Sequence, residues 1–193
     1  MTAKAFAAAV FVATVVQLAI GALVPGLEQF DGKAFGARLI AYPLLMLAAP
    51  VTWWVVRRRR GSSAPMPWDG FALIMAPFLV DVTGNALDLY DSVSWWDDAN
   101  HFVNWALLCA GFGLLIVRGG VRPPWAFVLA VTGLGALLAV GWEIGEWYTF
   151  IRHGTELDTA YEDTLVDETL GTLGGLLGTV LVAWQKRSVL RPT

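Results

Sequence analysis

Six apolar stretches, each about 20 residues long, constrain this chain more than any other feature of its sequence. A helix rises 1.5 Å per residue, so a stretch of this length crosses the roughly 30 Å hydrocarbon core of a bilayer. With 56% hydrophobic against 15% charged residues, the composition excludes an ordinary water-soluble domain. We therefore predict an all-α polytopic membrane bundle, one integral membrane domain over residues 1–193, with six transmembrane helices at about 5–24, 34–56, 68–89, 99–117, 124–150 and 160–184.

The first stretch, Ala5–Val24, follows Lys4 and is interrupted by Gln17. A basic residue before an apolar run is also typical of a secretory signal peptide. The run is longer than the apolar region of a signal peptide, and it lacks a convincing small-residue cleavage site before Pro25. We therefore expect a retained transmembrane helix.

Basic residues predict the orientation, because Lys and Arg are enriched in cytoplasmic loops. With both termini in the cytoplasm, ten of the 13 basic residues lie on that side: Lys4, Arg57, Arg58, Arg59, Arg60, Arg118, Arg122, Lys186, Arg187 and Arg191. Lys33, Arg38 and Arg152 remain outside. Of the 16 acidic residues, Asp69 alone lies on the cytoplasmic side. Acidic residues contribute little to insertion, so their clustering on the outer side needs another explanation.

Several polar side chains fall inside the predicted spans, where a carboxylate costs about 2.5–3.5 kcal/mol and must face the bundle, water or a partner. In the third span, Asp81, Asn85 and Asp88 are spaced to share one helical face. The outer ends of the last three spans carry further groups at helical spacing: Asp97, Asp98, His101 and Asn104; Glu143 and Glu146; Asp163 and Asp167. We expect all four sets to converge near the outer side.

Facing helices that supply carboxylates and a histidine build metal sites in helical bundles. The predicted ligands are Asp98, His101, Glu143, Glu146, Asp163 and Asp167. Their oxygen-rich set suits Mg, Mn or Ca, and His101 admits Zn or Fe. Asp81, Asn85, Asp88 and Asn104 are predicted as further buried polar residues. Structural interpretations stay open: His101 as a hydrogen-bonding residue, Asp97 and Asp98 as acids at a helix N-terminus, and Asp81 in an internal hydrogen bond.

Small residues and tryptophans have structural interpretations. Gly171, Gly174, Gly175 and Gly178 form small-xxx-small repeats in the last span, and Gly141 with Gly145 a similar pair in the fifth. Packing within the bundle is the favoured use, with a homodimer seam on the last helix as the alternative.

Most tryptophans lie near predicted helix ends, as expected of interfacial anchors. The single cysteine, Cys109, excludes an intrachain disulfide and a cysteine-based metal site.

Three motifs together resemble a known family: WWDDANH at 95–101, WEIGEW at 142–147 and DTLVD at 163–167. They resemble the uncharacterised YjdF-like bacterial inner-membrane proteins, which look distantly similar to the VanZ-like proteins of teicoplanin resistance. The resemblance covers about 95–182 and implies a small multi-pass helical protein of the bacterial cytoplasmic membrane whose motif residues face one another. It implies no known reaction. The sequence departs from the family pattern at Asn104 and Trp105, where a Ser-Gly pair would often follow the histidine.

Three functions remain open from the sequence, so it does not decide whether the chain is an enzyme. The first is a metal-dependent enzyme acting on a lipid or lipid-linked envelope substrate, with Glu143 and Asp167 as catalytic carboxylates. The second is a cation- or proton-binding or transport protein. The third is a non-catalytic protein whose acidic network supports packing or docks a partner. Membrane lipids are expected partners, and neither a long basic run nor a known motif indicates nucleic acid.

Overall fold

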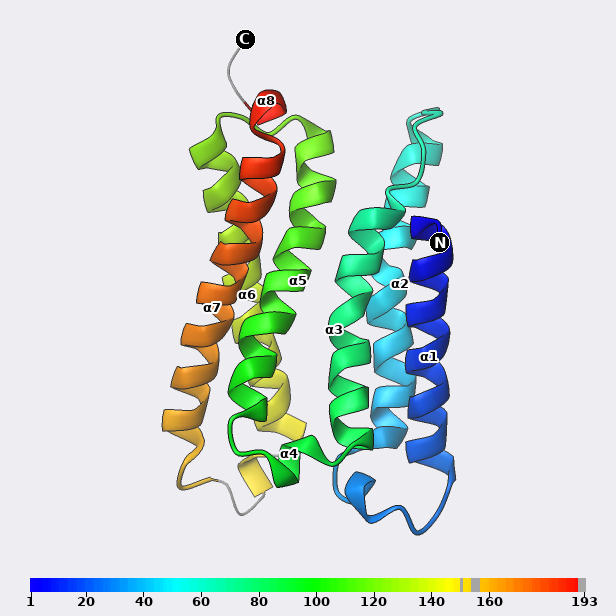
Figure 1. The fold of residues 1–193 in the computed structure, drawn as a ribbon, viewed down its shortest axis with the longest axis vertical. Coiled ribbons are helices and arrows are strands. Elements are labelled where there is room, and N and C mark those ends of the chain that lie inside the picture. Colours follow the sequence, from blue (N-terminus) through cyan, green and yellow to red (C-terminus); the bar gives the residue numbers. More distant parts are fainter. Residues whose placement is uncertain (150, 154–156, 191–193) are drawn as a thin grey trace. The chain divides into compact units, whose positions relative to one another are not determined.

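The computed structural model of the chain describes residues 1–149, 151–153 and 157–190, which are all-helical where they are regular (Figure 1). The long helices are α1 (Ala3–Leu23), α2 (Phe35–Arg59), α3 (Trp68–Ala86), α5 (Trp96–Ile116), α6 (Pro124–Thr149) and α7 (Ala160–Gln185). The short ones are η1 (Glu28–Phe30), α4 (Leu89–Ser92), η2 (Val117–Gly119), η3 (Ile151–His153) and α8 (Arg187–Leu190).

Five helices are long and apolar enough to cross a membrane: α1, α2, α5 extended by η2, α6 and α7. The remaining long helix, α3, has 19 residues and is not among these five; it carries Asp69, Asp81 and Asn85. An all-helical architecture with several helices able to cross a membrane is thus confirmed for the described residues, whereas the sixth span and the cytoplasmic termini stay predictions. The predicted span 124–150 ends at a residue outside the described ones.

The chain divides into two compact units, residues 1–93 and 94–193, and each is described by itself. In the first unit, α1 packs against α2 and α3. Ala7, Val10, Met46, Ala72 and Met75 form a buried apolar cluster between these helices. The Gln17 side-chain amide of α1 donates a hydrogen bond of 3.2 Å to the Thr83 hydroxyl of α3. The polar interruption of the first apolar stretch therefore has a partner in the bundle.

The second unit contains α5, α6 and α7, and α7 lies closely along α5. A Cβ atom at Gly174 or Gly178 would overlap the backbone carbonyl oxygen of Phe102 or Ala106, respectively. The glycine face of α7 is thus occupied by α5 of the same chain, as bundle packing requires. The expected close approach through Gly141 and Gly145 is wrong for this unit, because a Cβ there would meet no atom within 4 Å.

Candidate metal centre

The beginning of α5 brings an unexpected carboxylate to His101. The helix begins at Trp96, three residues before the predicted start, so Asp97 and Asp98 lie in its first turn. Asp97 then lies one turn before His101 on the same face, and its Oδ1 is 3.9 Å from His101 Nε2. Asp98 is exposed.

The imidazole of His101 lies among carboxylates from all three long helices of the second unit. Its Nε2 is 3.6 Å from Asp167 Oδ1 of α7, and its Nδ1 is 3.9 Å from Glu143 Oε1 of α6. These three side chains are at most 9% exposed. All lie toward the same end of the unit, because His101 and Asp167 are near the beginnings of their helices and Glu143 is near the end of its own.

Two groups of side chains could each hold a metal ion, because within each group the donor atoms lie within 4.8 Å of one another. The first group is Asp97, His101 and Asp167, and the second is His101, Glu143 and Glu146. His101 belongs to both. The structure therefore brings together the predicted ligands His101, Glu143, Glu146 and Asp167. The predicted ligands Asp98 and Asp163 belong to neither set, and both are exposed. Asp97 is not among the predicted ligands, although its spacing of four residues from His101 could have indicated it.

One buried oxygen in this cluster lacks a hydrogen-bond partner. Asp167 Oδ1 is the only carboxylate oxygen in this state among the described residues, and it is the atom that faces His101 Nε2. The Asp167 side chain is 4% exposed. A distance of 3.6 Å is too long for a hydrogen bond. Because buried polar atoms are nearly always satisfied, this oxygen requires a proton, an ion or a water molecule beside it.

The three long helices of the second unit, α5, α6 and α7, contain no Lys or Arg to balance their acids. Between Trp96 and Ile116, Pro124 and Thr149, and Ala160 and Gln185, the sequence contains no Lys or Arg. The acids of the same helices are Asp97, Asp98, Glu143, Glu146, Glu162, Asp163, Asp167 and Glu168. Arg152 of η3 has its guanidinium 4.9 Å from the ring of Tyr148. His101 is therefore the only side chain on these helices that can carry positive charge.

One turn further along α5, Asn104 has a second buried polar atom without a hydrogen-bond partner. Its amide nitrogen donates a hydrogen bond of 3.1 Å to Asn100 Oδ1, but its own Oδ1 is buried without a partner. The prediction that Asn104 is a largely buried polar residue is consistent with this position.

In the first unit, the carboxylate of Asp81 has a full set of hydrogen-bond partners, unlike that of Asp167. Asp81 Oδ2 accepts hydrogen bonds from Arg38 Nη1 at 2.9 Å and Tyr42 at 2.8 Å. Asp81 Oδ1 accepts one of 2.8 Å from Tyr90 and a longer one of 3.4 Å from Asn85. Asp81 is thus paired with a cation and saturated by donors from its own unit, which matches the structural interpretation of an internal hydrogen-bonded network. Its expected convergence with the acids of α5–α7 stays a prediction, since they belong to the other unit.

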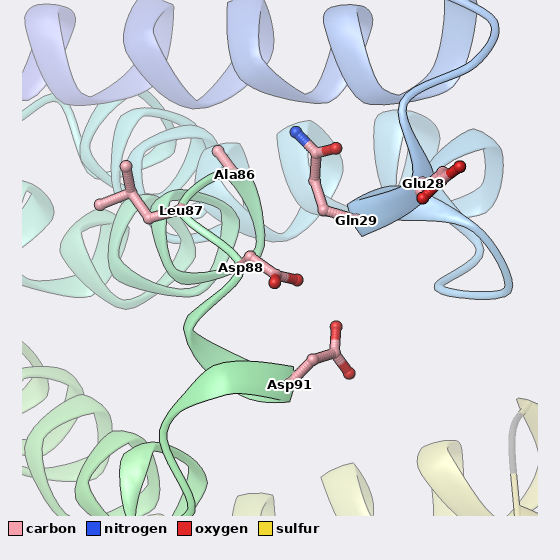
Figure 2. Close-up of a pocket in the computed structure, with 6 residues that line it drawn as sticks. All are labelled: Glu28, Gln29, Ala86, Leu87, Asp88 and Asp91. Atoms are coloured by element: carbon pink, nitrogen blue, oxygen red, sulfur yellow. The ribbon is translucent and has the colours of Figure 1, made fainter.

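The prediction that Asp88 is buried on the face of Asp81 and Asn85 is wrong. α3 ends at Ala86, and Asp88 has a left-handed backbone with φ 57° at the start of α4. This turn directs Asp88 into an open pocket of about 550 Å³, lined also by Glu28, Gln29 and Asp91 (Figure 2). Asp91 accepts a hydrogen bond from Lys33, which holds the pKa of Asp91 below its ordinary value of 3.8. The acids of this pocket are exposed.

Comparison with known proteins identifies a family but no characterised relative. A family model described as "Predicted membrane protein (DUF2238)" matches residues 5–188, nearly the whole chain. No curated protein and no solved structure matches the chain. The finer likeness to YjdF-like and VanZ-like proteins stays a prediction.

Proposed function

Because the chain belongs to the DUF2238 family of predicted membrane proteins, we propose that it is a multi-pass protein of the bacterial inner membrane that holds a divalent metal ion. The ion lies among His101, Asp167 and the neighbouring carboxylates of α5–α7. We further propose that the protein uses this ion to act on a lipid or lipid-linked envelope substrate.

The observation that carries the metal site is the pair formed by His101 Nε2 and Asp167 Oδ1. Nitrogen and oxygen ligands lie about 2.0–2.2 Å from a Zn²⁺ ion, so two ligands at a tetrahedral angle are about 3.4 Å apart. The observed separation is 3.6 Å, with the oxygen buried and without a hydrogen-bond partner. A cation between the two atoms would satisfy that oxygen and balance acids that have no Lys or Arg on their helices.

The membrane placement follows from the charges at the two ends of the second unit. Arg118, Arg122, Lys186 and Arg187 follow or precede the helix ends opposite the acidic cluster. With α3 as a sixth span and both termini cytoplasmic, these residues are inside and the metal centre lies toward the outer side. An outer-side centre could reach lipid headgroups and lipid-linked precursors of the envelope.

The metal would supply Lewis acidity for a phosphate or carbonyl oxygen and lower the pKa of bound water. Asp97 has a side chain that is 48% exposed, so the centre is not sealed from solvent. A carboxylate beside the bound ion would serve as general base. Metal-assisted hydrolysis is the reaction class that this donor set supports best.

A transport pathway has less support from the same helices. Beyond the acidic cluster, the parts of α5, α6 and α7 toward the other end contain no ionisable residue apart from Cys109, which is buried. Intramembrane ion pathways are normally marked by such residues along the route. The acids therefore form a site at one end of the unit.

Metal content tests the proposal. Protein purified in detergent after supplementation with Mg, Mn, Ca, Zn and Fe would be analysed by mass spectrometry, with a His101→Gln/Asp167→Asn variant and an exposed-acid control, Glu162→Gln. We expect about one ion per chain in wild type and control, and loss of most of it in the double variant at equal folded yield. Hydrolysis of lipid-linked substrates in proteoliposomes would then be assayed. A wild-type protein without metal would leave the acids as a structural network and refute the proposal.

A further inference from the structure

The two sets of donor atoms that share His101 have different roles. Resting on the proposed metal site, we propose that the ion binds on the Nε2 side of His101, with Asp97 and Asp167. Glu143, whose Oε1 lies 3.9 Å from Nδ1, is then a positioning residue that would move closer to accept a hydrogen bond from Nδ1–H and so orient the imidazole for metal binding.

The chemistry of imidazole separates the two sets. A neutral imidazole has one nitrogen with a lone pair for a metal, and its other nitrogen carries a hydrogen. His101 has carboxylates beside both nitrogens: Asp97 and Asp167 at Nε2, and Glu143 at Nδ1. Both sets can hold a metal ion at once only if the ring loses both protons. A single ion on one side, with a hydrogen bond on the other, is the arrangement that metal-ligating histidines almost always adopt.

Three observations place the ion at Nε2. The oxygen without a hydrogen-bond partner, Asp167 Oδ1, lies on this side at 3.6 Å, the shortest of the three histidine–carboxylate distances. The same nitrogen faces a second carboxylate, because Asp97 Oδ1 is 3.9 Å away. Asp97 is half-exposed, so water or substrate can reach the open coordination positions on this side.

Burial suits Glu143 to the role of hydrogen-bond acceptor. Its side chain is 8% exposed, against 48% for Asp97, and it lies across the ring from the proposed ion. A carboxylate that accepts the N–H of a ligating histidine selects the tautomer and makes the metal-binding nitrogen more basic. Replacing such a partner typically weakens metal binding about 10–100-fold without removing the site.

A titration distinguishes a ligand from a positioning residue. Zn²⁺ and Mn²⁺ binding by detergent-purified full-length protein would be measured for wild type, Asp167→Asn, Glu143→Gln and the control Glu162→Gln. We expect one ion per chain in wild type and control, and no ion at the same concentrations in Asp167→Asn. Glu143→Gln should still bind one ion, about 10–100-fold more weakly. Two ions per chain, or a site that survives Asp167→Asn but not Glu143→Gln, would overturn the assignment.

Nitrogen-15 NMR of histidine supplies a readout that a merely structural Glu143 would not move. The chain has two histidines, so a His153→Gln variant identifies the signals of His101. In the Zn²⁺-loaded protein we expect a protonated Nδ1 and a metal-bound Nε2, with the Nδ1–H signal shifted in Glu143→Gln. Metal on Nδ1 would contradict the inference while leaving the proposed function intact. A wild-type protein that binds neither ion would refute both.

Discussion

Asp81 and Asp167 are both acids on long helices, yet they meet opposite surroundings. Asp81 is paired with Arg38 and receives hydrogen bonds from two tyrosines of its unit. Asp167 has His101 beside it and one buried oxygen without a hydrogen-bond partner. A buried charge is tolerated only when it is paired or neutralised. The carboxylate of Asp81 has a cation and hydrogen-bond donors beside it, whereas one oxygen of Asp167 has no hydrogen-bond partner. The difference is consistent with a structural role for Asp81 and is the reason that Asp167 is proposed as a metal ligand.

Arg38 and Asp81 should stabilise the first unit together, so the effects of replacing them should be energetically coupled. Asp81→Asn leaves the largely buried Arg38 without its counter-charge, and we expect a loss of about 3 kcal/mol in the free energy of unfolding. The double variant Arg38→Gln/Asp81→Asn should be less destabilised than the two single variants added together. Unfolding of the four proteins in detergent measures this coupling, and strictly additive effects would argue against the pair.

The Lys33–Asp91 pair should produce a small pH dependence. Since Lys33 lowers the pKa of Asp91, the pair stabilises the folded state above the ordinary pKa of 3.8. This contribution is lost as the pH falls through the lower, folded-state pKa. Asp91 is exposed, so we expect less than about 1 kcal/mol. The difference in Tm between wild type and Asp91→Asn should be small at neutral pH and vanish in acid; a difference that grows on acidification would contradict this assignment.

At the scale of single helices, α7 combines two tasks along its length. Its first three turns carry Asp163, Asp167 and Glu168, and the following turns present Gly171, Gly174, Gly175 and Gly178. The glycines allow the backbone of α7 to approach α5 closely. Because the same two helices carry Asp167 and His101, this close packing also determines the distance between the two proposed ligands.

Gly174→Ala should therefore disrupt both packing and metal binding. Its Cβ would overlap the carbonyl oxygen of Phe102, a backbone atom that cannot rotate away, and overpacking of this kind costs about 1–3 kcal/mol. Gly133→Ala in α6 is the control, since a Cβ there meets no atom within 4 Å. We expect a lower Tm and weaker metal binding for Gly174→Ala alone. Equal behaviour of the two variants would show that α7 does not depend on this contact.

Hydrophobicity and spacing predict the long helices and most residues of the cluster around His101, but the remaining features depend on where the helices begin and end. The apolar stretches locate all six long helices, because burial in lipid or in the bundle leaves a strong signal. The start of α5 at Trp96 and the end of α3 at Ala86 depend on local backbone geometry that the sequence does not display. These ends replace Asp98 with Asp97 in the cluster and move Asp88 to an exposed pocket. The pairing of Asp81 with Arg38 joins two helices and likewise has no signal in residue spacing.

At the scale of the whole molecule, basic and acidic residues are concentrated at opposite ends of the predicted transmembrane helices. The predicted inner loops hold the Arg57–Arg60 run and Arg118, whereas the acids gather at the opposite helix ends. In the second unit this division agrees with the position of the acidic cluster. The six-span topology requires α3 to cross the membrane as well, although it is not among the five helices that are long and apolar enough to do so by composition.

Cysteine accessibility in intact cells tests this topology. The native Cys109 is buried and can stay in place, so Asp31→Cys, Ser62→Cys and Ser94→Cys each add one exposed thiol. A membrane-impermeant maleimide should label positions 31 and 94 but not 62, because the six-span topology predicts the first two outside and the third inside. Permeabilised cells, in which all three should react, are the control. Protection of position 94 together with position 62 would show that α3 does not cross the membrane.

The central claim, that His101 and the neighbouring acids hold a metal ion, is tested most directly by pulsed EPR of the Mn²⁺-loaded protein. Coupling of the manganese electron spin to a directly bound nitrogen identifies an imidazole ligand. We expect the coupling of one nitrogen in wild type, retained in His153→Gln and lost in His101→Gln. A protein that retains no manganese, or a spectrum without nitrogen coupling that His101→Gln leaves unchanged, would contradict the claim.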